Sequence, residues 1–112
     1  MKKTLLICFA GYLFLSCAEE LSQDQEIYIG VWDEQSSPFY PHNIITIKGK
    51  GKATVETETS SSESTSFSGR VKITGTVLQI GSEKMRIDVP PELDTIDHSY
   101  WMQIDLRWYK RN

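Results

Sequence analysis

The stretch of sequence that decides the fold is YWMQIDLRWY, residues 100–109. Apolar or aromatic side chains occupy every second position of this segment, namely Tyr100, Met102, Ile104, Leu106 and Trp108. Because successive side chains of a strand point to opposite sides, this period of two residues predicts a β-strand with one buried face. It is the longest such alternation in the chain, and we expect one continuous strand at the centre of a sheet.

Shorter alternating segments precede this stretch. They cover residues 27–32, 43–48, 52–58, 67–74, 77–80 and 83–89, and turns rich in glycine or proline separate most of them. We expect Pro90 and Pro91 to end the last of them. From residue 27 onward no segment has the period and caps of a helix, and residues 93–98 have room for one helical turn at most. The sequence therefore predicts an all-β domain, a small antiparallel β-sandwich or β-barrel of about six to eight short strands.

Two polar segments are predicted to connect strands. Residues 59–66 are nearly all Ser and Thr. Such a stretch buries too little apolar surface to offset the cost of ordering its backbone, so we expect a mobile loop. Residues 48–52 read KGKGK, and we expect these lysines to keep a hairpin tip soluble and to discourage edge pairing.

The N-terminus resembles a bacterial lipoprotein signal peptide. Lys2 and Lys3 precede an apolar run at residues 5–15, and FLSC at residues 14–17 resembles the lipobox, with Phe14 where Leu is usual. The run of 11 residues is well short of the roughly 20 that span a bilayer as a helix. An ordinary secretory signal is the alternative, but its cleavage site needs a small residue where Phe14 stands. The resemblance implies a signal peptide at residues 1–16, a lipidated acidic tether at 17–26 beginning with Cys17, and one β domain at 27–112.

This resemblance also implies a location and a partner. The protein would belong to the bacterial cell envelope as an outer-membrane lipoprotein, with the membrane as its partner through the lipid on Cys17. Residues 18–20 (AEE) resemble the surface-export signal of many Bacteroidetes lipoproteins. The same acidic residues also suit a solvated tether at either address, so the periplasmic and the surface face both stay open.

Charge and cysteine content exclude several classes of function. The chain has 12 basic and 15 acidic residues, and removal of Lys2 and Lys3 with the signal changes the net charge from −3 to −5. An acidic domain lacks the clustered basic footprint of a nucleic-acid binder, so we expect no nucleic-acid partner. Cys8 lies in the signal and Cys17 would carry the lipid. The mature domain therefore has no thiol for a disulfide, a thiolate metal site or a cysteine nucleophile.

Gly30-x-Trp32 on the first expected strand is similar to the lipocalin pattern and to the lipocalin-like lipoproteins of the Bacteroidetes. In that pattern a basic residue of the last strand covers the indole, a role that Arg107 or Arg111 would take here. The resemblance implies a β-barrel that binds a ligand. Residues 18–112 number only 95, so the strands must be brief or the barrel incomplete. The alternative is that Trp32 is a large core residue and Gly30 a bulge.

Two classes of function follow from these observations. In the first, a lipocalin-like module holds a small apolar ligand or a glycan against some of four aromatic residues: Phe67, Tyr100, Trp101 and Tyr109. In the second, the domain is a protein-interaction or inhibitor module with an envelope protein as partner, similar to the small β-barrel lipoproteins that inhibit lysozyme. Residues 68–70 (SGR) carry that second resemblance. An accessory role in an envelope complex is a third possibility.

Catalytic and metal-binding patterns are weak. His42 and His98 lie beside turn residues without the spacing of a zinc site, and we expect both to be exposed loop residues. Asp94, Asp97 and His98 share one loop but lack the alternation of an EF-hand. We therefore expect no enzyme activity, metal or cofactor. Residues 94–96 (DTI) resemble the Bacteroidetes O-glycosylation sequon, which implies a glycan on Thr95.

Overall fold

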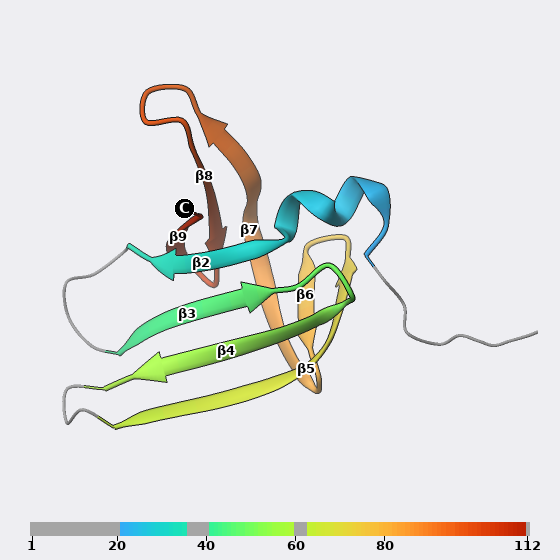
Figure 1. Ribbon diagram of the computed structural model, residues 1–112, viewed down its shortest axis with the longest axis vertical. Coiled ribbons are helices and arrows are strands. Elements are labelled where there is room, and N and C mark those ends of the chain that lie inside the picture. The colour runs from blue at the N-terminus through green and yellow to red at the C-terminus, as the bar shows by residue number, and fades with distance from the viewer. Residues whose placement is uncertain (1–20, 36–40, 60–62, 112) are drawn as a thin grey trace, which may run out of the picture.

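The computed structural model describes residues 21–35, 41–59 and 63–111. Within these residues, eight strands form a closed antiparallel β-barrel, in which each strand pairs with the next and the last pairs with the first (Figure 1). The elements in chain order are the 3-10 helix η1 (Gln23–Tyr28) and the strands β2 (Gly30–Glu34), β3 (His42–Ile47), β4 (Lys52–Glu58), β5 (Ser64–Thr74), β6 (Val77–Ile80), β7 (Glu83–Asp94), β8 (Ser99–Ile104) and β9 (Arg107–Arg111). The all-β prediction is confirmed, and the architecture is the barrel and not the sandwich.

Alternate strand positions fill the barrel interior. The largest fully buried side chains are Trp32, Ile45, Ile47, Leu78, Ile80, Met102 and Ile104. A barrel of eight strands is just wide enough for its own side chains or for one small ligand. Here side chains fill the middle of the barrel, so a ligand would have to bind toward one end.

Residues 100–109 form a hairpin and not the single strand expected from the sequence. A two-residue turn at Asp105 and Leu106 joins β8 to β9, with φ angles of 49° and 66°. Positive φ at both central residues is typical of a type I′ turn, whose twist matches the flanking strands. The turn moves the inward set of side chains by one position, from Ile104 before it to Tyr109 after it. The expected burial of Leu106 and Trp108 is therefore wrong, and they are 68% and 39% exposed.

Two other strands are longer than the sequence predicted. β7 continues through Pro90 and Pro91, and its pairing with β8 shifts register between Val89 and Glu92. Proline lacks a backbone donor, and an irregularity of this kind is where a ladder tolerates it. In the predicted Ser/Thr loop, residues 64–66 pair with residues 56–58 of β4. The mobile-loop prediction is wrong for these three residues, and residues 60–62 lie outside the described part of the chain.

The folded domain begins earlier than residue 27. Leu21 belongs to the buried core and is 9% exposed, and residues 23–28 form η1 where the sequence predicted first a tether and then a strand. Gln25 Nε2 donates a hydrogen bond of 3.1 Å to Ile73 O, and Trp32 Nε1 donates one of 2.8 Å to Tyr28 O. These bonds hold η1 against one end of the barrel. No helix among the described residues is long and apolar enough to cross a membrane.

β5 changes its pairing partner halfway along its length. Residues 64–70 pair with β4, whereas residues 71–74 pair with β6. The change occurs where Gly69 packs on Gly81, since a Cβ atom on Gly69 would lie 2.6 Å from Gly81 Cα. Among the described strands, the first half of β5 has no ladder partner on its second edge. This edge includes Phe67, which lines a cavity described below.

Candidate functional site

The η1 end of the barrel is closed by Arg111. Its guanidinium lies 5.2 Å from the centre of the Trp32 ring and 4.4 Å from that of Tyr100. Arg111 Nη1 also donates hydrogen bonds to Ile27 O at 2.6 Å and to Ile29 O at 2.9 Å. The expected cation over the indole is therefore present, and it comes from the second of the two arginines considered.

Gly30 makes this close approach possible. Its φ is 144°, a region that residues with side chains rarely adopt, and a Cβ atom there would collide with the Arg111 side chain. The assignment of Arg107 to the structural motif is wrong, because that residue lies at the other end of β9 and pairs with Glu34.

A cavity of about 260 Å³ lies at the end of the barrel opposite η1. Apolar residues of five strands form its walls, and polar residues surround its rim. The lining residues are Asn43, Ile45, Val55, Thr57, Phe67, Glu83, Lys84, Met85, Ile104, Asp105, Arg107 and Tyr109. Ligand sites in proteins usually measure about 300 to 1,000 Å³, so this cavity suits a small ligand.

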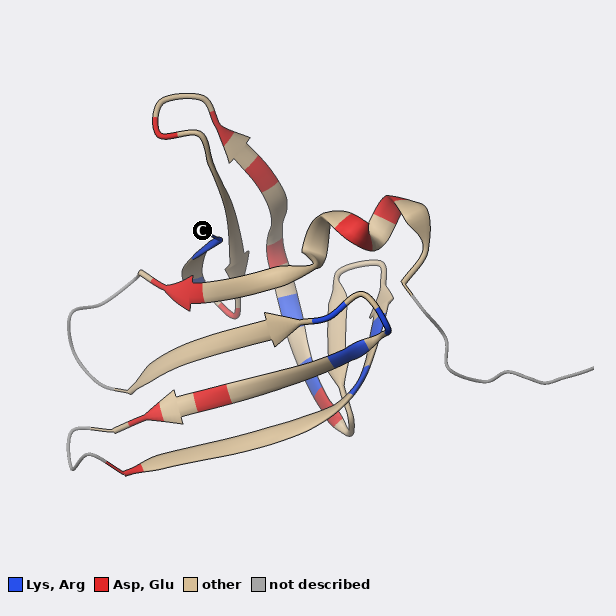
Figure 2. Ribbon diagram, in the orientation of Figure 1, with Lys and Arg blue, Asp and Glu red and all other residues tan. Residues whose placement is uncertain are grey.

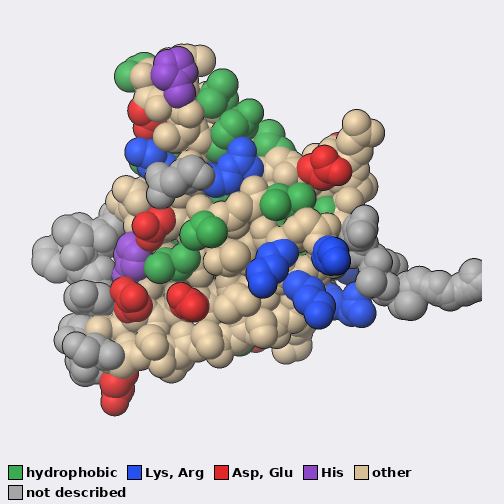
Figure 3. Space-filling view, viewed as in Figure 1, with side chains coloured by type: hydrophobic (Ala, Val, Ile, Leu, Met, Phe, Trp, Pro, Cys, Tyr) green, Lys and Arg blue, Asp and Glu red, His purple; other side chains and the backbone are tan. Residues whose placement is uncertain are grey.

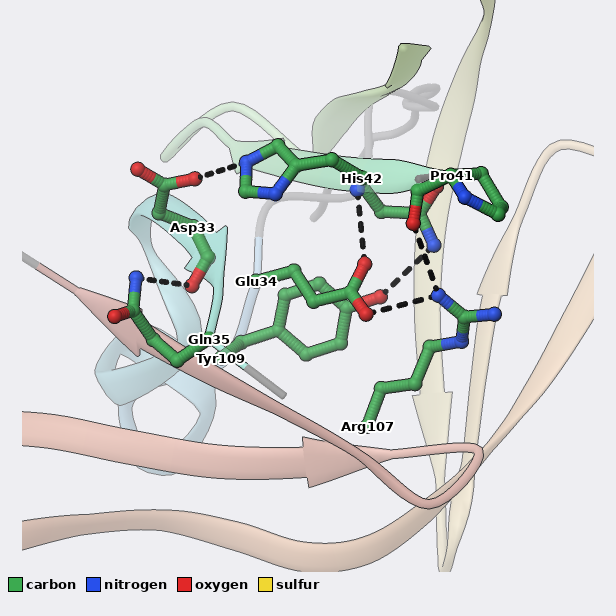
Figure 4. A network of polar contacts seen from close by, with 8 residues as sticks. Asp33, Glu34, Gln35, Pro41, His42, Arg107 and Tyr109 are labelled. Carbon is green, nitrogen blue, oxygen red and sulfur yellow. Dashed lines mark hydrogen bonds and ion pairs between the residues drawn. The ribbon is translucent and has the colours of Figure 1, made fainter. Parts of the chain in front are cut away.

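Glu34 is a buried carboxylate beside this cavity, and its side chain is 1% exposed. One oxygen accepts a hydrogen bond of 2.9 Å from the backbone N–H of Asn43, and the other accepts one of 2.8 Å from Arg107 Nη1 (Figure 4). Arg107 also donates to Pro41 O at 3.4 Å. A buried charge is costly unless it is paired and hydrogen-bonded. The pair with Arg107 meets that need and fixes the end of β9 against β2 and β3.

Tyr109 extends the polar group into the cavity. Asn43 Nδ2 donates to the Tyr109 hydroxyl at 3.3 Å, and Thr57 Oγ1 donates to Asn43 Oδ1 at 2.7 Å. Burial raises the pKa of the Tyr109 phenol, and the hydrogen bond from Asn43 opposes this effect. The phenol is therefore neutral at physiological pH and can donate a hydrogen bond to a ligand. Together these groups offer donors and acceptors beside the apolar walls.

The four predicted ligand-binding aromatic residues do not form one site. Phe67 and Tyr109 line the cavity. Tyr100 lies under Arg111 at the closed end, and Trp101 faces outward from β8. Only two of the four predicted residues therefore meet.

Sequence reasoning missed the polar members of the site, namely Glu34, Asn43 and Thr57. For Glu34 a signal was present, because it stands two residues after Trp32 on one strand. An inward Trp32 therefore places Glu34 inside the barrel as well.

A second, shallower hollow of about 230 Å³ lies on the outer face, lined by Glu92, Leu93, Asp94, Trp101 and Trp108. Lys110 Nζ lies 5.6 Å from the centre of the Trp101 ring and 3.5 Å from Asp97. The hydrogen bond from the Ser99 backbone lowers the pKa of Asp97, and Lys110 adds to this effect. Trp101 Nε1 is buried, and no acceptor among the described residues meets hydrogen-bond geometry with it. Trp101 therefore lines this outer hollow and not the cavity.

The two histidines lie in different settings. His42 is half-buried at the start of β3, and its Nε2 lies 2.8 Å from Asp33 Oδ1, so its assignment to an exposed loop is wrong. His98 is exposed in the β7–β8 turn with a φ of 61°, as expected of a turn residue. Thr95 is exposed in the same turn, and its glycosylation stays a prediction.

The carboxylates around the β7–β8 turn bind the backbone. Asp94 accepts a hydrogen bond from Ile96 N, and Asp97 accepts one from Ser99 N. In the described part of the chain, no group of three or more His, Cys, Asp or Glu residues could hold a metal ion.

Comparison with known proteins does not assign the chain to a family. No protein-family model matches the chain, and neither a curated protein nor a solved structure matches it.

Proposed function

We propose that the protein is an outer-membrane lipoprotein, anchored through Cys17, whose barrel binds a small glycan in the cavity opposite η1. The observation that carries the proposal is the cavity itself, with Asn43, Thr57 and Tyr109 presenting polar atoms beside the aromatic ring of Phe67. Sites for small molecules combine apolar walls with a few polar groups that fix orientation. The role proposed is binding and not catalysis.

The polarity of the lining favours a glycan over a purely apolar ligand. A sugar has both hydroxyl groups and apolar C–H faces, which would match Asn43 and Tyr109 on one side and Phe67 on the other. These groups already bond to one another, but the hydroxyl groups and the Asn43 amide keep further donor and acceptor sites, which a sugar could satisfy and an apolar ligand could not. A ligand would enter past the unpaired edge of β5 at Phe67, which lines the cavity.

The test is a titration monitored by amide NMR shifts. Free N-acetylglucosamine and mannose serve as glycan probes, and laurate serves as the apolar probe. We expect a sugar to shift the amides of Asn43, Thr57 and Phe67. Shifts with laurate alone would support the apolar ligand instead, and no shift with any probe would count against this site.

A matched pair of variants locates the binding. Phe67 and Trp108 are 37% and 39% exposed, and they line different hollows. We expect Phe67→Ala to weaken sugar binding and Trp108→Ala to preserve it. The reverse result would move the glycan site to the outer face of β8 and β9.

The β7–β8 hairpin supports a second candidate, a protein-interaction role. It projects from the barrel (Figure 1), and Leu93 and Ile96 on it are 49% and 89% exposed. A photo-crosslinking residue at Ile96 should then capture one envelope protein in living cells, whereas the same residue at Ser82 should not. Equal crosslinking at both positions would oppose this role.

A further inference from the structure

Five cations gather at the η1 end of the barrel, although the chain as a whole is acidic. We define the basic face as Lys48, Lys50, Lys52, Arg70 and Lys72. Figure 2 shows blue ribbon segments on the β3–β4 turn and the adjoining parts of β4 and β5, and Figure 3 shows blue side chains grouped at the same end. All five residues are exposed, and none forms an ion pair with a described carboxylate.

The backbone brings these like charges together. Lys52 on β4 lies directly opposite Arg70 on β5. Lys48 N donates to Lys52 O at 2.8 Å, and Val71 N donates to Gly51 O at 2.8 Å, so the lysine turn is fixed beside β5. Like charges directly opposite each other destabilise a sheet. An anion bound between them would remove that cost.

A hollow of about 330 Å³ on this face has the groups that bind phosphate. Lys48, Lys52 and Arg70 line it, together with the hydroxyl-bearing residues Thr54 and Ser68. Arginine and lysine beside hydroxyl groups are the usual partners of phosphate oxygens. In Figure 2 the ribbon positions of the two acidic residues of η1, Asp24 and Glu26, lie apart from the blue segments.

The position of the basic face relative to the N-terminus identifies the anion. Leu21 is buried in the core, and Ile29, the residue directly after η1, lies beside the lysine turn, because its Cδ1 would be 3.6 Å from a Cβ atom on Gly49. Leu21 stands four positions after Cys17, and an extended chain of that length spans at most about 14 Å. A lipid headgroup layer is itself about 5 to 8 Å thick. A lipid on Cys17 would therefore hold this end of the barrel at the membrane surface.

We infer that the basic face binds the phosphate groups of anionic lipids in the membrane that holds the anchor. The inference rests on the proposed lipidation of Cys17 and not on the glycan site. Contact at the η1 end directs the cavity, at the opposite end, away from the membrane. A cluster of four or more basic residues beside a membrane anchor is typical of binding to anionic lipid.

Lysine footprinting of the lipidated protein tests the inference. The protein is reconstituted into vesicles of phosphatidylcholine alone or of phosphatidylcholine mixed with phosphatidylglycerol, and lysine labelling is measured by mass spectrometry. We expect labelling of Lys48, Lys50, Lys52 and Lys72 to slow several-fold on the anionic vesicles and to recover in high salt. Lys84 and Lys110 are internal controls in the same sample and should label equally on both vesicles.

Two variants with the same change in net charge complete the design. Lys50→Gln with Lys52→Gln should remove the protection of Lys48 and Lys72. Arg86→Gln with Lys110→Gln should leave that protection intact. Equal labelling of Lys48 and Lys72 on the two kinds of vesicle would overturn the inference.

Two further readouts separate the possible failures. Inorganic phosphate is added to the protein in detergent without vesicles, and equal protection there would mean that the ligand is a soluble anion and not a lipid. The mass of the N-terminal peptide reports lipidation on its own. An unmodified Cys17 would refute the anchor and the inference together, while loss of sugar binding would affect neither.

Discussion

Substitution of Arg107 by methionine should lower the free energy of unfolding, because it removes the charged partner of the buried Glu34 carboxylate. In Arg107→Met the Glu34 carboxylate keeps the hydrogen bond from Asn43 N but loses its charged partner. Loss of one member of a buried pair costs about 3 to 5 kcal/mol, because the other charge stays in the interior. The Arg107 side chain is 39% exposed and water reaches it, so we expect the lower end, about 3 kcal/mol. For a domain of this size the midpoint of thermal unfolding should fall by about 12 to 24 °C.

Urea denaturation followed by circular dichroism measures this loss. The matched variant is Glu34→Gln with Arg107→Met, which removes both charges and should regain most of the lost stability. A loss below about 1 kcal/mol, or a double variant no more stable than Arg107→Met, would show that the pair has no such structural role.

Three further predictions concern the anchor, the core and the tyrosines. Cys17→Ser should release the protein from membranes, as fractionation would show, because the thiol accepts the lipid; retention at the wild-type level would refute the anchor. Trp32→Ala should lower the free energy of unfolding by about 3 to 5 kcal/mol, and Ile104→Ala by about 2 to 5 kcal/mol, because both side chains are buried. Leu106→Gly should raise it by up to about 1 kcal/mol, because glycine adopts a positive φ without strain. If Leu106→Gly instead lowers stability as much as Ile104→Ala, the turn assignment is wrong. Burial raises the pKa of Tyr28 and Tyr109, so stability should fall as pH rises above the ordinary tyrosine pKa of about 10; Tyr109→Phe should reduce this alkaline loss in a series of urea melts, and an unchanged loss would contradict it.

The period-two pattern predicted the fold class correctly because it records which face of each strand is buried. The pattern could not locate the β8–β9 turn. Asp105 is polar and Leu106 is apolar, so the two residues continue the alternation although the chain reverses its direction at them. An Asn-Gly pair at these positions would have predicted a type I′ turn, whereas a leucine at position 106 predicts a buried strand residue. The pairing of residues 64–66 was hidden for a related reason. These residues pair with β4 through backbone hydrogen bonds. Their serine and threonine side chains do not produce the apolar alternation from which a strand is predicted.

The candidate site was less predictable than the fold. Aromatic residues indicate places where a ligand can stack, and two of the four, Phe67 and Tyr109, do line the cavity. The sequence separates Glu34 from Arg107 by 73 positions, so only closure of the barrel brings them together. The sequence also could not show that Arg111, and not Arg107, is the cation over Trp32. The register of β9 against β2 decides it, and the register depends on the turn that the pattern concealed.

The contact of Arg111 with the backbone of Ile27 and Ile29 joins segments that are 84 and 82 residues apart. Every hairpin from β3 to β8 can form while the chain emerges, but the β2–β9 seam must wait for the final strand. Bonds between such distant segments form late and slow the folding of β proteins. If the proposed lipoprotein is exported in the unfolded state, this delay is useful. The barrel would then not close until the last strand had crossed the inner membrane. The precursor would therefore stay unfolded enough to be translocated.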